Sequence, residues 1–415
     1  MRRWLGLLIC LLVPSALLAE EKFFFQKGDK IVFLGDSITE QYQYSSDIEL
    51  YLTTRFPDWN LVFINAGIGG DTANGGAGRF KAHILDEKPT CVTINFGMND
   101  GGYGAFDKPR NDTFVKQTTA MVEMANKAKV RVALISPNAV DPRIAERFKL
   151  YLETQKQFYA PLKEIAEKHK TAYVDQYATT RSVLEKLASE NAKTVIPFGD
   201  GFHTSSPGGL LMAYSILTGM NAPGLVSDVR IDVAKNEATA EKCKVTNLAV
   251  KQDTITFERS DEAIPVPVQK DWLTLLPYLK DLKDFNYYGL KMTGLTAEKY
   301  KLSIDGKEIG QFTSKELSEG VNLGNVTTGP IYDQGQKVRT AIKAKNELVH
   351  KRFNEVVKFT PPNFPAWAAD LQTALNEKKA KELSTRLEVI DTKQAEIYKM
   401  VQPTTHRFEV VAVAK

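Results

Sequence analysis

The chain has 415 residues, of which 43% are hydrophobic and 25% are charged, the balance of a soluble globular protein with two or three domains. Its net charge of +4 is nearly neutral for that length. The composition therefore gives no support to a nucleic-acid-binding protein or to one held on an anionic membrane.

Residues 1–19 have the pattern of a secretory signal peptide. Arg2 and Arg3 precede an apolar run from Trp4 to Val13, and the segment ends in the small residue Ala19. The run is much shorter than the ~20 residues of a membrane-spanning helix, so cleavage after Ala19 is expected rather than retention as an anchor. The pattern predicts a secreted or periplasmic protein, with no stable membrane insertion after cleavage.

The next part of the chain, residues 20–225, alternates short apolar runs with helical stretches. Such alternation predicts βαβ units and a parallel sheet covered by helices on both faces. The predicted strands are Ile31–Leu34, Leu61–Ala66, Val92–Phe96, Val130–Ser136 and Thr171–Asp175, and the predicted helices include Asn111–Lys129, Tyr151–Lys170 and Pro207–Leu217.

The pattern changes after residue 225. Short alternating segments and a hairpin turn at Asp305-Gly306 predict a small antiparallel β module over 226–335. Residues 336–415 return to helical periodicity at 337–358 and 365–401, and a last strand-like run, Arg407–Val413, can rejoin the β module. The predicted fold is thus an α/β protein with a small β module and a C-terminal helical hairpin.

Two cysteines, Cys91 and Cys243, would remain after removal of the signal peptide. An oxidising compartment would permit a disulfide between them. Cys91 opens a predicted apolar strand, where a buried thiol is the ordinary state, and Cys243 falls in another predicted domain. Two free thiols are therefore expected.

Ser37 follows the first predicted strand, in the segment Ile31-Val-Phe-Leu-Gly-Asp-Ser37. The carboxyl ends of strands in a parallel sheet are where ligands bind. Taken alone, a serine at such a turn is more often a helix N-cap than a nucleophile. The chain has no G-x-S-x-G elbow around it, which excludes the α/β-hydrolase arrangement.

Asp200 and His203 supply what a nucleophilic serine needs. A carboxylate three residues before the histidine can hold the imidazole by Nδ1 and leave Nε2 to face Ser37. The pair could also begin a metal site, but no third ligand has supporting spacing. The other four histidines, at positions 83, 169, 350 and 406, lie in charged or C-terminal segments, and solvated surface roles are expected for them.

Gly70 and Asn99 follow the second and third predicted strands, so they should emerge near Ser37. The Gly70 N–H and the Asn99 amide could join the Ser37 N–H as an oxyanion hole. Separately, a chain-turning glycine and an Asx-turn residue are the simpler interpretations. The glycine-rich stretch 67–78 matches neither the dinucleotide fingerprint nor a Walker loop, so no nucleotide cofactor is expected.

Four segments together resemble the sequence blocks of the SGNH (GDSL-type) esterase/lipase family. They are Gly35-Asp-Ser-Ile-Thr39, Asn65-Ala-Gly-Ile-Gly-Gly-Asp-Thr72, Gly97-Met-Asn-Asp100 and Asp200-Gly-Phe-His203, within residues 28–220. The resemblance implies a flavodoxin-like α/β/α sandwich, a Ser37–His203–Asp200 triad, an oxyanion hole of Ser37, Gly70 and Asn99, and no cofactor. Thr204-Ser-Ser-Pro207 departs from the family, which often has proline directly after the histidine. The C-terminal half resembles the appendage of some secreted bacterial members, and no role can be carried over to it.

The expected function is hydrolysis of short acyl esters, above all O-acetyl groups on carbohydrate, because an exported enzyme meets glycans. Tyr103, Phe106 and Phe202 could line the acyl or sugar pocket, although packing roles are equally compatible. A carbohydrate O-acyltransferase would use the same site. A glycan-binding protein with a vestigial site is the alternative from another class, and the presence of every required catalytic residue argues against it.

Overall fold

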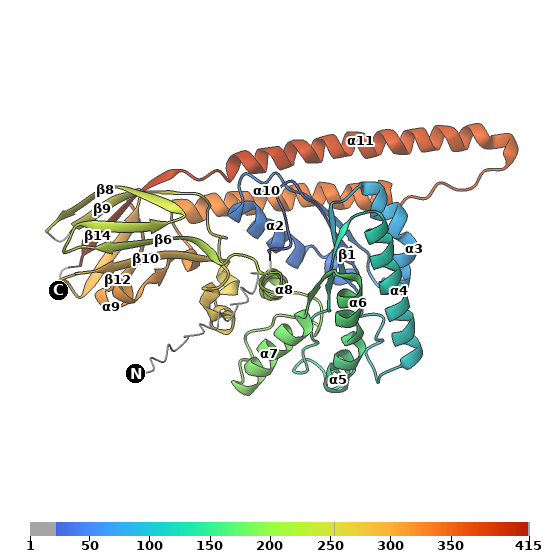
Figure 1. Ribbon diagram of the computed structural model, residues 1–415, viewed down its shortest axis with the longest axis horizontal. Helices are drawn as coiled ribbons and strands as arrows, with labels where there is room; N and C mark the ends of the chain where they lie inside the picture. The colour runs from blue at the N-terminus through green and yellow to red at the C-terminus, as the bar shows by residue number, and fades with distance from the viewer. Residues whose placement is uncertain (1–21, 253, 414–415) are drawn as a thin grey trace, which may run out of the picture.

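The computed structural model describes residues 22–252 and 254–413, so the predicted signal peptide, residues 1–19, lies outside the described residues. Figure 1 shows an α/β body, a β region beside it, and two long helices, α10 (Pro330–Arg352) and α11 (Ala369–Met400), that run along one side of the α/β body, with α10 beginning next to the β region. Buried apolar side chains from these parts form one contiguous core.

The α/β body is built on a parallel sheet of five strands in the order β2-β1-β3-β4-β5, which confirms the predicted fold class. β1 lies between β2 and β3, so the chain changes direction across the sheet at β1. Ligands bind at such a switch point, outside the carboxyl ends of the two strands. The strands are β1 (Lys30–Gly35), β2 (Val62–Gly67), β3 (Cys91–Asn95), β4 (Arg131–Ile135) and β5 (Ala172–Val174).

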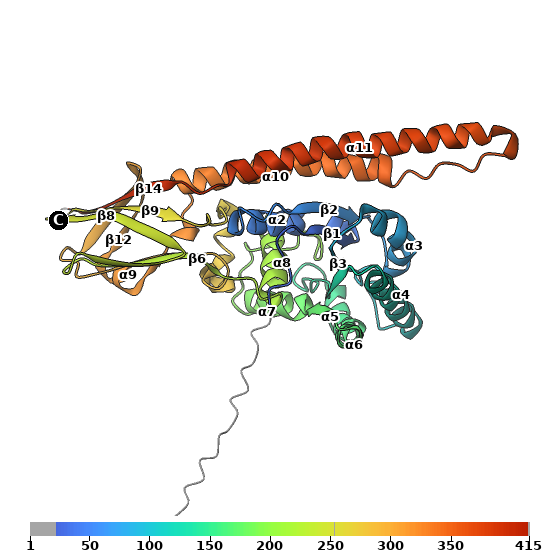
Figure 2. The same ribbon diagram turned by 45° about the horizontal axis from the view of Figure 1, so that its top comes forward.

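Helices cover both faces of this sheet (Figure 2). α2 packs on α8 and α8 on α7, whereas α3 packs on α4 and α4 on α6. The helix predicted over 151–170 is two helices, because Pro161 has no N–H to continue the hydrogen-bond ladder and instead begins α6. The helices are α1 (Ser37–Glu40), α2 (Gln43–Arg55), α3 (Ala73–His83), α4 (Lys108–Lys127), α5 (Arg147–Tyr159), α6 (Pro161–His169), α7 (Gln176–Ser189) and α8 (Ser206–Gly219).

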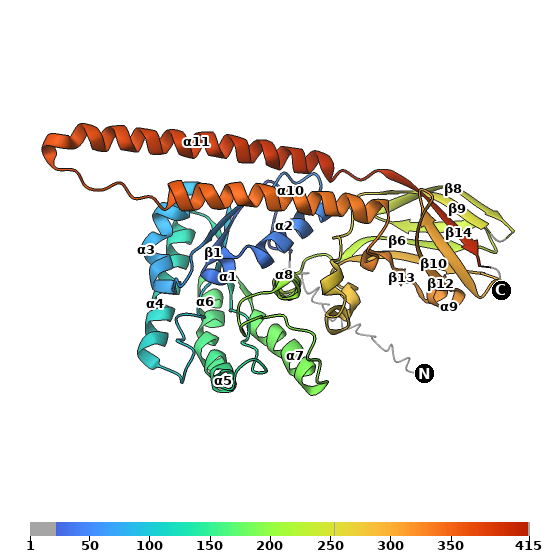
Figure 3. The same ribbon diagram turned by 180° about the vertical axis from the view of Figure 1, so that it is seen from behind.

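The β module consists of two sheets with the strand orders β13-β10-β6-β7 and β12-β11-β14-β9-β8, seen from behind in Figure 3. The β6–β10 pair is parallel and is joined by a long connection, and the other pairs are antiparallel. The elements are β6 (Leu225–Asp232), β7 (Glu237–Glu241), β8 (Cys243–Lys251), β9 (Thr254–Asp261), β10 (Tyr287–Thr293), β11 (Lys299–Ile304), β12 (Lys307–Thr313), α9 (Ser314–Glu319), β13 (Val321–Asn322) and β14 (Thr405–Ala412).

The last strand, β14, returns to this module after the two long helices. It pairs with β9 on one side and with β11 on the other, so it lies in the interior of the five-stranded sheet. The strand-like run predicted at 407–413 therefore does rejoin the β module.

The C-terminal helices are fastened to the α/β body by buried polar contacts. Lys345 of α10 pairs with Glu49 of α2 at 2.7 Å, and both side chains are almost inaccessible to solvent. Arg352, at the end of α10, pairs with Glu87 at 2.8 Å. Near the other end of the hairpin, the Tyr398 hydroxyl of α11 accepts a hydrogen bond from the backbone N–H that precedes β2.

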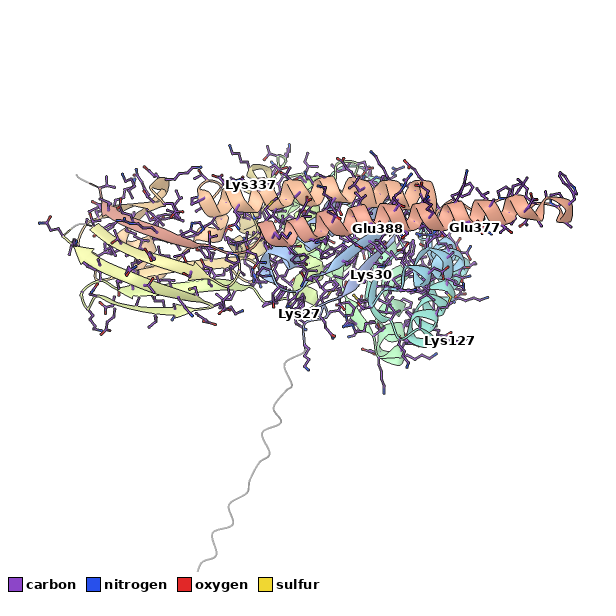
Figure 4. All side chains as sticks on the ribbon, turned by 90° about the horizontal axis from the view of Figure 1, so that it is seen from above. Lys27, Lys30, Lys127, Lys337, Glu377 and Glu388 are labelled. Atoms are coloured by element: carbon purple, nitrogen blue, oxygen red, sulfur yellow. The ribbon has the colours of Figure 1, made fainter. Side chains whose placement is uncertain are left out.

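The start of α11 extends past the body. Seen from above, Glu377 lies toward the projecting end of this helix and Glu388 lies over the body (Figure 4). Residue 353 begins a short π-helical turn that prolongs α10 before the chain reverses. The observed helices thus begin and end within several residues of the predicted hairpin, 337–358 and 365–401.

Candidate active site

Ser37 is placed by the turn that ends β1. A Cβ atom on Gly35 would lie 2.2 Å from Thr39 Oγ1 and 2.8 Å from the carbonyl oxygen of Asn95, so only glycine lets α1 start this close to the strand. The Asp36 side chain accepts a hydrogen bond of 2.9 Å from the Ile38 N–H and caps α1. Ser37 is therefore the first residue of a helix that begins at the switch point of the sheet.

His203 and Asp200 meet Ser37 from a loop before α8. The Ser37 Oγ lies 2.8 Å from His203 Nε2, and His203 Nδ1 lies 2.6 Å from Asp200 Oδ2. The second oxygen of Asp200 accepts hydrogen bonds from the backbone N–H groups of Phe202 and His203. This is the order of contacts in which an imidazole can take a proton from a hydroxyl while a carboxylate fixes its tautomer.

Asp200 stays ionised at neutral pH. Its partial burial acts to raise the pKa, but the hydrogen bonds from the His203 ring and from two backbone N–H groups outweigh that effect and hold the pKa below its ordinary value. An ionised carboxylate at Nδ1 favours the proton on that nitrogen. Nε2 is then free to accept from Ser37.

Gly70 and Asn99 lie together in the loops that follow β2 and β3, the two strands on either side of β1. Gly70 has φ +73°, a left-handed conformation that favours glycine and ends the turn after β2. The Asn99 side-chain nitrogen donates to the backbone oxygen of Asp71 at 2.9 Å, directly after Gly70. An amide NH₂ has two hydrogens, so one of them is left for an oxygen of a bound molecule.

Tyr103 holds the other end of that amide. Its hydroxyl donates to Asn99 Oδ1 at 3.0 Å, which fixes which end of the amide is the donor. Tyr103 has φ +58°, a strained conformation for an aromatic residue, and its ring packs 5.3 Å from Tyr151 and 4.9 Å from Phe202. Sequence reasoning placed Tyr103 in a substrate pocket and missed this contact, because no local pattern signals it.

The other two predicted aromatic residues differ in position. The Phe202 ring lies 4.4 Å from the His203 ring, so it flanks the imidazole. Phe106 is half-exposed and packs 6.3 Å from Phe158. The structure therefore brings Tyr103 and Phe202 to the site, and it gives Phe106 a contact elsewhere.

An ion pair that the sequence did not reveal supports the loop after β2. Arg79 of α3 donates to Asp71 at 2.8 Å and also to the backbone oxygen of Gly35 at 3.2 Å. It thereby links the turn that carries Ser37 to the turn that carries Gly70. Residues eight apart in sequence give no local signal of such a pair.

Two carboxyl groups that adjoin Ser37 and Asn99 in sequence, Asp36 and Asp100, have raised pKa values. Burial, with smaller contributions from the charges of Asp100 and Asp71, raises the pKa of Asp36 to about 7, against the opposing hydrogen bond from the Ile38 N–H. Burial also raises the pKa of Asp100 to about 6. Asp36 caps α1 and Asp100 accepts a hydrogen bond from the Ala73 N–H at the start of α3, so both carboxyl groups have structural roles.

The remaining histidines and cysteines lie elsewhere. The expected surface role is wrong for His406, which is 8% exposed and bonds Asp305 at 2.7 Å, because β14 carries it into the β module. Partial burial lowers the pKa of His83 to about 4. Cys91 and Cys243 are both free.

Clustered metal ligands and membrane-spanning helices are both absent from the described residues. Over 22–252 and 254–413, no three His, Cys, Asp or Glu side chains are grouped to hold a metal ion. Within the same ranges, every helix is too short or too polar to cross a bilayer.

Comparison with known proteins identifies the family. The model of the GDSL-like lipase/acylhydrolase family matches residues 33–208. Esterase TesA of Pseudomonas aeruginosa is 31% identical over 148 residues, 35% of this chain and 68% of that protein. An acetylxylan esterase of Geobacillus stearothermophilus is 24% identical over 217 residues, 46% of this chain and 93% of that protein. The chain therefore belongs to the GDSL-like lipase/acylhydrolase family, and it is a serine ester hydrolase that acts on acyl esters.

One solved structure is similar over nearly the whole chain. It is that of a gut microbial diltiazem-metabolizing enzyme, with a TM-score of 0.79 and 25% sequence identity, covering 95% of this chain and 100% of that one. The β region and the C-terminal helices are thus part of an arrangement shared with another protein, beyond the hydrolase core that the shorter relatives match.

Proposed function

We propose that the protein hydrolyses short-chain acyl esters, in particular O-acetyl groups on carbohydrate, through an acyl-enzyme on Ser37. The observation that carries the proposal is the 2.8 Å contact between Ser37 Oγ and His203 Nε2, backed by Asp200. A serine hydroxyl is a weak nucleophile until a base removes its proton, and this contact supplies the base.

The reaction proceeds in two halves. Ser37 Oγ attacks the ester carbonyl carbon as His203 Nε2 takes its proton, and the resulting oxyanion is held by the N–H groups of Ser37 and Gly70 and by the Asn99 amide. His203 then gives the proton to the departing alcohol oxygen, which leaves the acyl group on Ser37. A water molecule, deprotonated by His203, attacks the acyl carbon and frees the acid.

The acetyl-carbohydrate specificity is supported by the relatives. The Geobacillus stearothermophilus relative is an acetylxylan esterase and matches this chain over 93% of its own length. Phe202 packs beside His203 and against Tyr103, and we propose that these two aromatic rings bound the space for the acyl group. Such a boundary suits a small acyl group.

Export of the enzyme forms part of the proposal. It is supported by the sequence pattern of residues 1–19 and by an uncharacterized lipoprotein of Bacillus subtilis that is 34% identical over 79 residues, 32% of that protein. Mass spectrometry of the mature protein from its host should find Glu20 at the N-terminus. An intact Met1 in the folded, active protein would contradict export by this route.

The catalytic proposal is tested with p-nitrophenyl esters of increasing chain length and with acetylated xylan. We expect hydrolysis to be fastest for acetyl, and Ser37→Ala to remove it, with a loss on the order of 10³-fold or more. Ser182→Ala, at an exposed serine of α7, is the matched control and should keep full activity. Full activity in Ser37→Ala would overturn the mechanism, and product partition with and without a sugar acceptor separates hydrolysis from acyl transfer.

A further inference from the structure

A cavity of about 420 Å³ lies next to the site, between the α1–α2 connection and α10. Its lining comes from two stretches far apart in sequence, residues 40–47 and 339–351. The volume is within the range of ordinary small-molecule sites, roughly 300–1,000 Å³. Helix α10 therefore builds one wall of a cavity whose other wall directly follows the segment that carries Ser37.

Two polar groups of this lining have no hydrogen-bond partner within the described part of the chain. The Nε of Arg339 is buried and makes no hydrogen bond there. The hydroxyl of Tyr42 is likewise buried and unpaired. Buried polar groups are costly to leave unsatisfied, so two of them at one cavity indicate a ligand that would complete their hydrogen bonds.

Tyr42 also carries backbone strain. It has φ +60°, a left-handed conformation that is uncommon for an aromatic residue. Its ring lies 5.7 Å from the His350 ring of α10 in an edge-to-face arrangement, so it joins the two walls. Strain of this kind persists where the surroundings hold it in place and is common at ligand sites.

The chemistry of the cavity suits a neutral, polyhydroxylated ligand. Acidic and basic side chains line it in equal number, which disfavours a strongly charged ligand: Glu40, Asp47 and Glu347 against Arg339, Lys343 and Lys351. Sugar hydroxyl groups both donate and accept hydrogen bonds, so they can satisfy both kinds of side chain. Burial raises the pKa of Asp47 to about 7, against the opposing charges of Arg339 and Lys343, so near neutrality this group can also serve as acceptor or donor.

The cavity is adjacent to the reacting groups. Glu40 ends the single turn of α1 that Ser37 begins, and three residues of helix rise only about 4.5 Å. Gln41, also in the lining, accepts a hydrogen bond of 3.2 Å from Thr204, the residue after His203. A ligand held in the cavity would thus lie beside the two segments that carry Ser37 and His203.

We propose that this cavity is a subsite for the sugar portion of the ester that Ser37 attacks, with Asp47 and the α10 side chains Arg339 and Lys343 as its hydrogen-bonding groups. The inference rests on the proposed function and extends it. It gives the C-terminal region a part in substrate selection.

The experiment compares two substrates of the full-length protein. Acetylated xylo-oligosaccharide has a sugar portion, and p-nitrophenyl acetate has none. We expect Asp47→Asn and Lys343→Ala to lower kcat/KM on the oligosaccharide about ten- to a hundredfold, mainly through KM, and to change hydrolysis of p-nitrophenyl acetate less than about twofold. Lys337→Ala, at an exposed residue of the same helix (Figure 4), is the control and should alter neither.

Two results would overturn the subsite: no effect of either variant on the oligosaccharide, or an equal loss on both substrates. A wild-type protein without Ser37-dependent esterase activity would instead contradict the proposed function. Calorimetric binding of unacetylated xylo-oligosaccharide to Ser37→Ala tests the subsite without catalysis. Binding that is weakened by adding Lys343→Ala supports the subsite, and no binding to Ser37→Ala overturns it.

Discussion

At the scale of single residues, the site depends on side chains that hold other side chains. The Asn99 amide is fixed at its nitrogen by the backbone of Asp71 and at its oxygen by Tyr103. An amide that could rotate would present its oxygen to a developing oxyanion in half of its orientations. Tyr103 is therefore a positioning residue, and its effect should appear in turnover rather than in substrate binding.

Replacing Tyr103 by phenylalanine tests this role. The ring packing against Tyr151 and Phe202 is kept and only the hydroxyl is lost, so we expect kcat on p-nitrophenyl acetate to fall about tenfold with little change in KM. Removal of a whole oxyanion donor costs more, ~10²–10³-fold. Tyr278→Phe, which removes a hydroxyl bonded to Glu190 on the surface, is the control. Unchanged kcat in Tyr103→Phe would rule out the positioning role.

The raised pKa of Asp36 predicts that the free energy of unfolding depends on pH. In the folded chain its pKa is about 7, against 3.8 as the ordinary value, so between these pH values the folded state binds more protons than the unfolded state. The stability from protonated Asp36 is fully present below pH 3.8 and is lost as the pH rises to about 7. Asp36→Asn cannot titrate and keeps the N-cap hydrogen bond.

The free energy of unfolding of Asp36→Asn, minus that of the wild type, should therefore increase between pH 4 and pH 8, by at most about 4 kcal/mol. Urea denaturation at a series of pH values measures it. Asp370→Asn, at an exposed site of α11, is the matched control. A difference that is independent of pH would show that burial does not perturb Asp36.

The segments that carry the site residues could be predicted from local sequence motifs. The side chains that hold those residues in place could not, because they act through tertiary contacts. Ser37, Gly70, Asn99 and the Asp200–His203 pair lie in short strand-end segments that a reader of the sequence can find. The Arg79–Asp71 pair and the Tyr103 hydroxyl act across loops. Their roles follow only from distances in the folded chain.

At the scale of elements, α10 is joined to the α/β body by a buried ion pair. Burial lowers the pKa of Lys345 and raises that of Glu49, and each charge opposes the shift of the other. Such a pair adds little net stability, but removing one partner strands a charge in the interior. The pair therefore fixes where α10 lies against α2, which also sets one wall of the cavity beside Ser37.

Lys345→Met should destabilise the protein by about 3–5 kcal/mol, because Glu49 is left without its cation. Lys345→Met combined with Glu49→Leu should recover most of that loss, since no buried charge remains. Chemical denaturation of both variants measures the effect, with Lys337→Met at an exposed position of α10 as control. A double variant as unstable as the single one would mean that packing, rather than the stranded charge, is responsible.

Strands and helices with a strong hydrophobic pattern could be predicted from the sequence. A helix rich in residues that disfavour helix formation could not. The five parallel strands stand out in the sequence because they are continuous apolar runs. α3 does not, because it contains three glycines that disfavour a helix in isolation: Gly75, Gly76 and Gly78. The close approach of the Phe96 ring explains one of them, since a Cβ on Gly76 would lie 2.4 Å from that ring.

At the scale of the whole molecule, the β module and the helices depend on each other. Lys307 of β12 pairs with Asp333 of α10 at 2.9 Å, and β14 follows α11 into the interior of the five-stranded sheet. The parts that the sequence suggested as separate domains share one core. Alternating polarity predicted strands in this region, but it could not show that the last strand lies between β9 and β11.

Truncation before Thr405 should unfold the β module or cause aggregation. Without β14, both β9 and β11 present unpaired edges and a gap in the sheet. Truncation after Val413, which keeps β14, is the control. Size-exclusion chromatography and circular dichroism compare the two. A monomeric truncated protein with its full β-sheet signal would show that the module folds without its last strand.

The place of β14 also bears on the order in which the protein assembles. The strands and helices of the α/β body end at about residue 219. The five-stranded sheet of the β module, in contrast, needs β14, which begins more than 90 residues after β12 ends at Thr313. During synthesis, the edges of β9 and β11 that pair with β14 therefore stay unpaired until the final residues emerge. A chain that ends before that point would hold an unfinished sheet, whose open edges on β9 and β11 could pair with other chains.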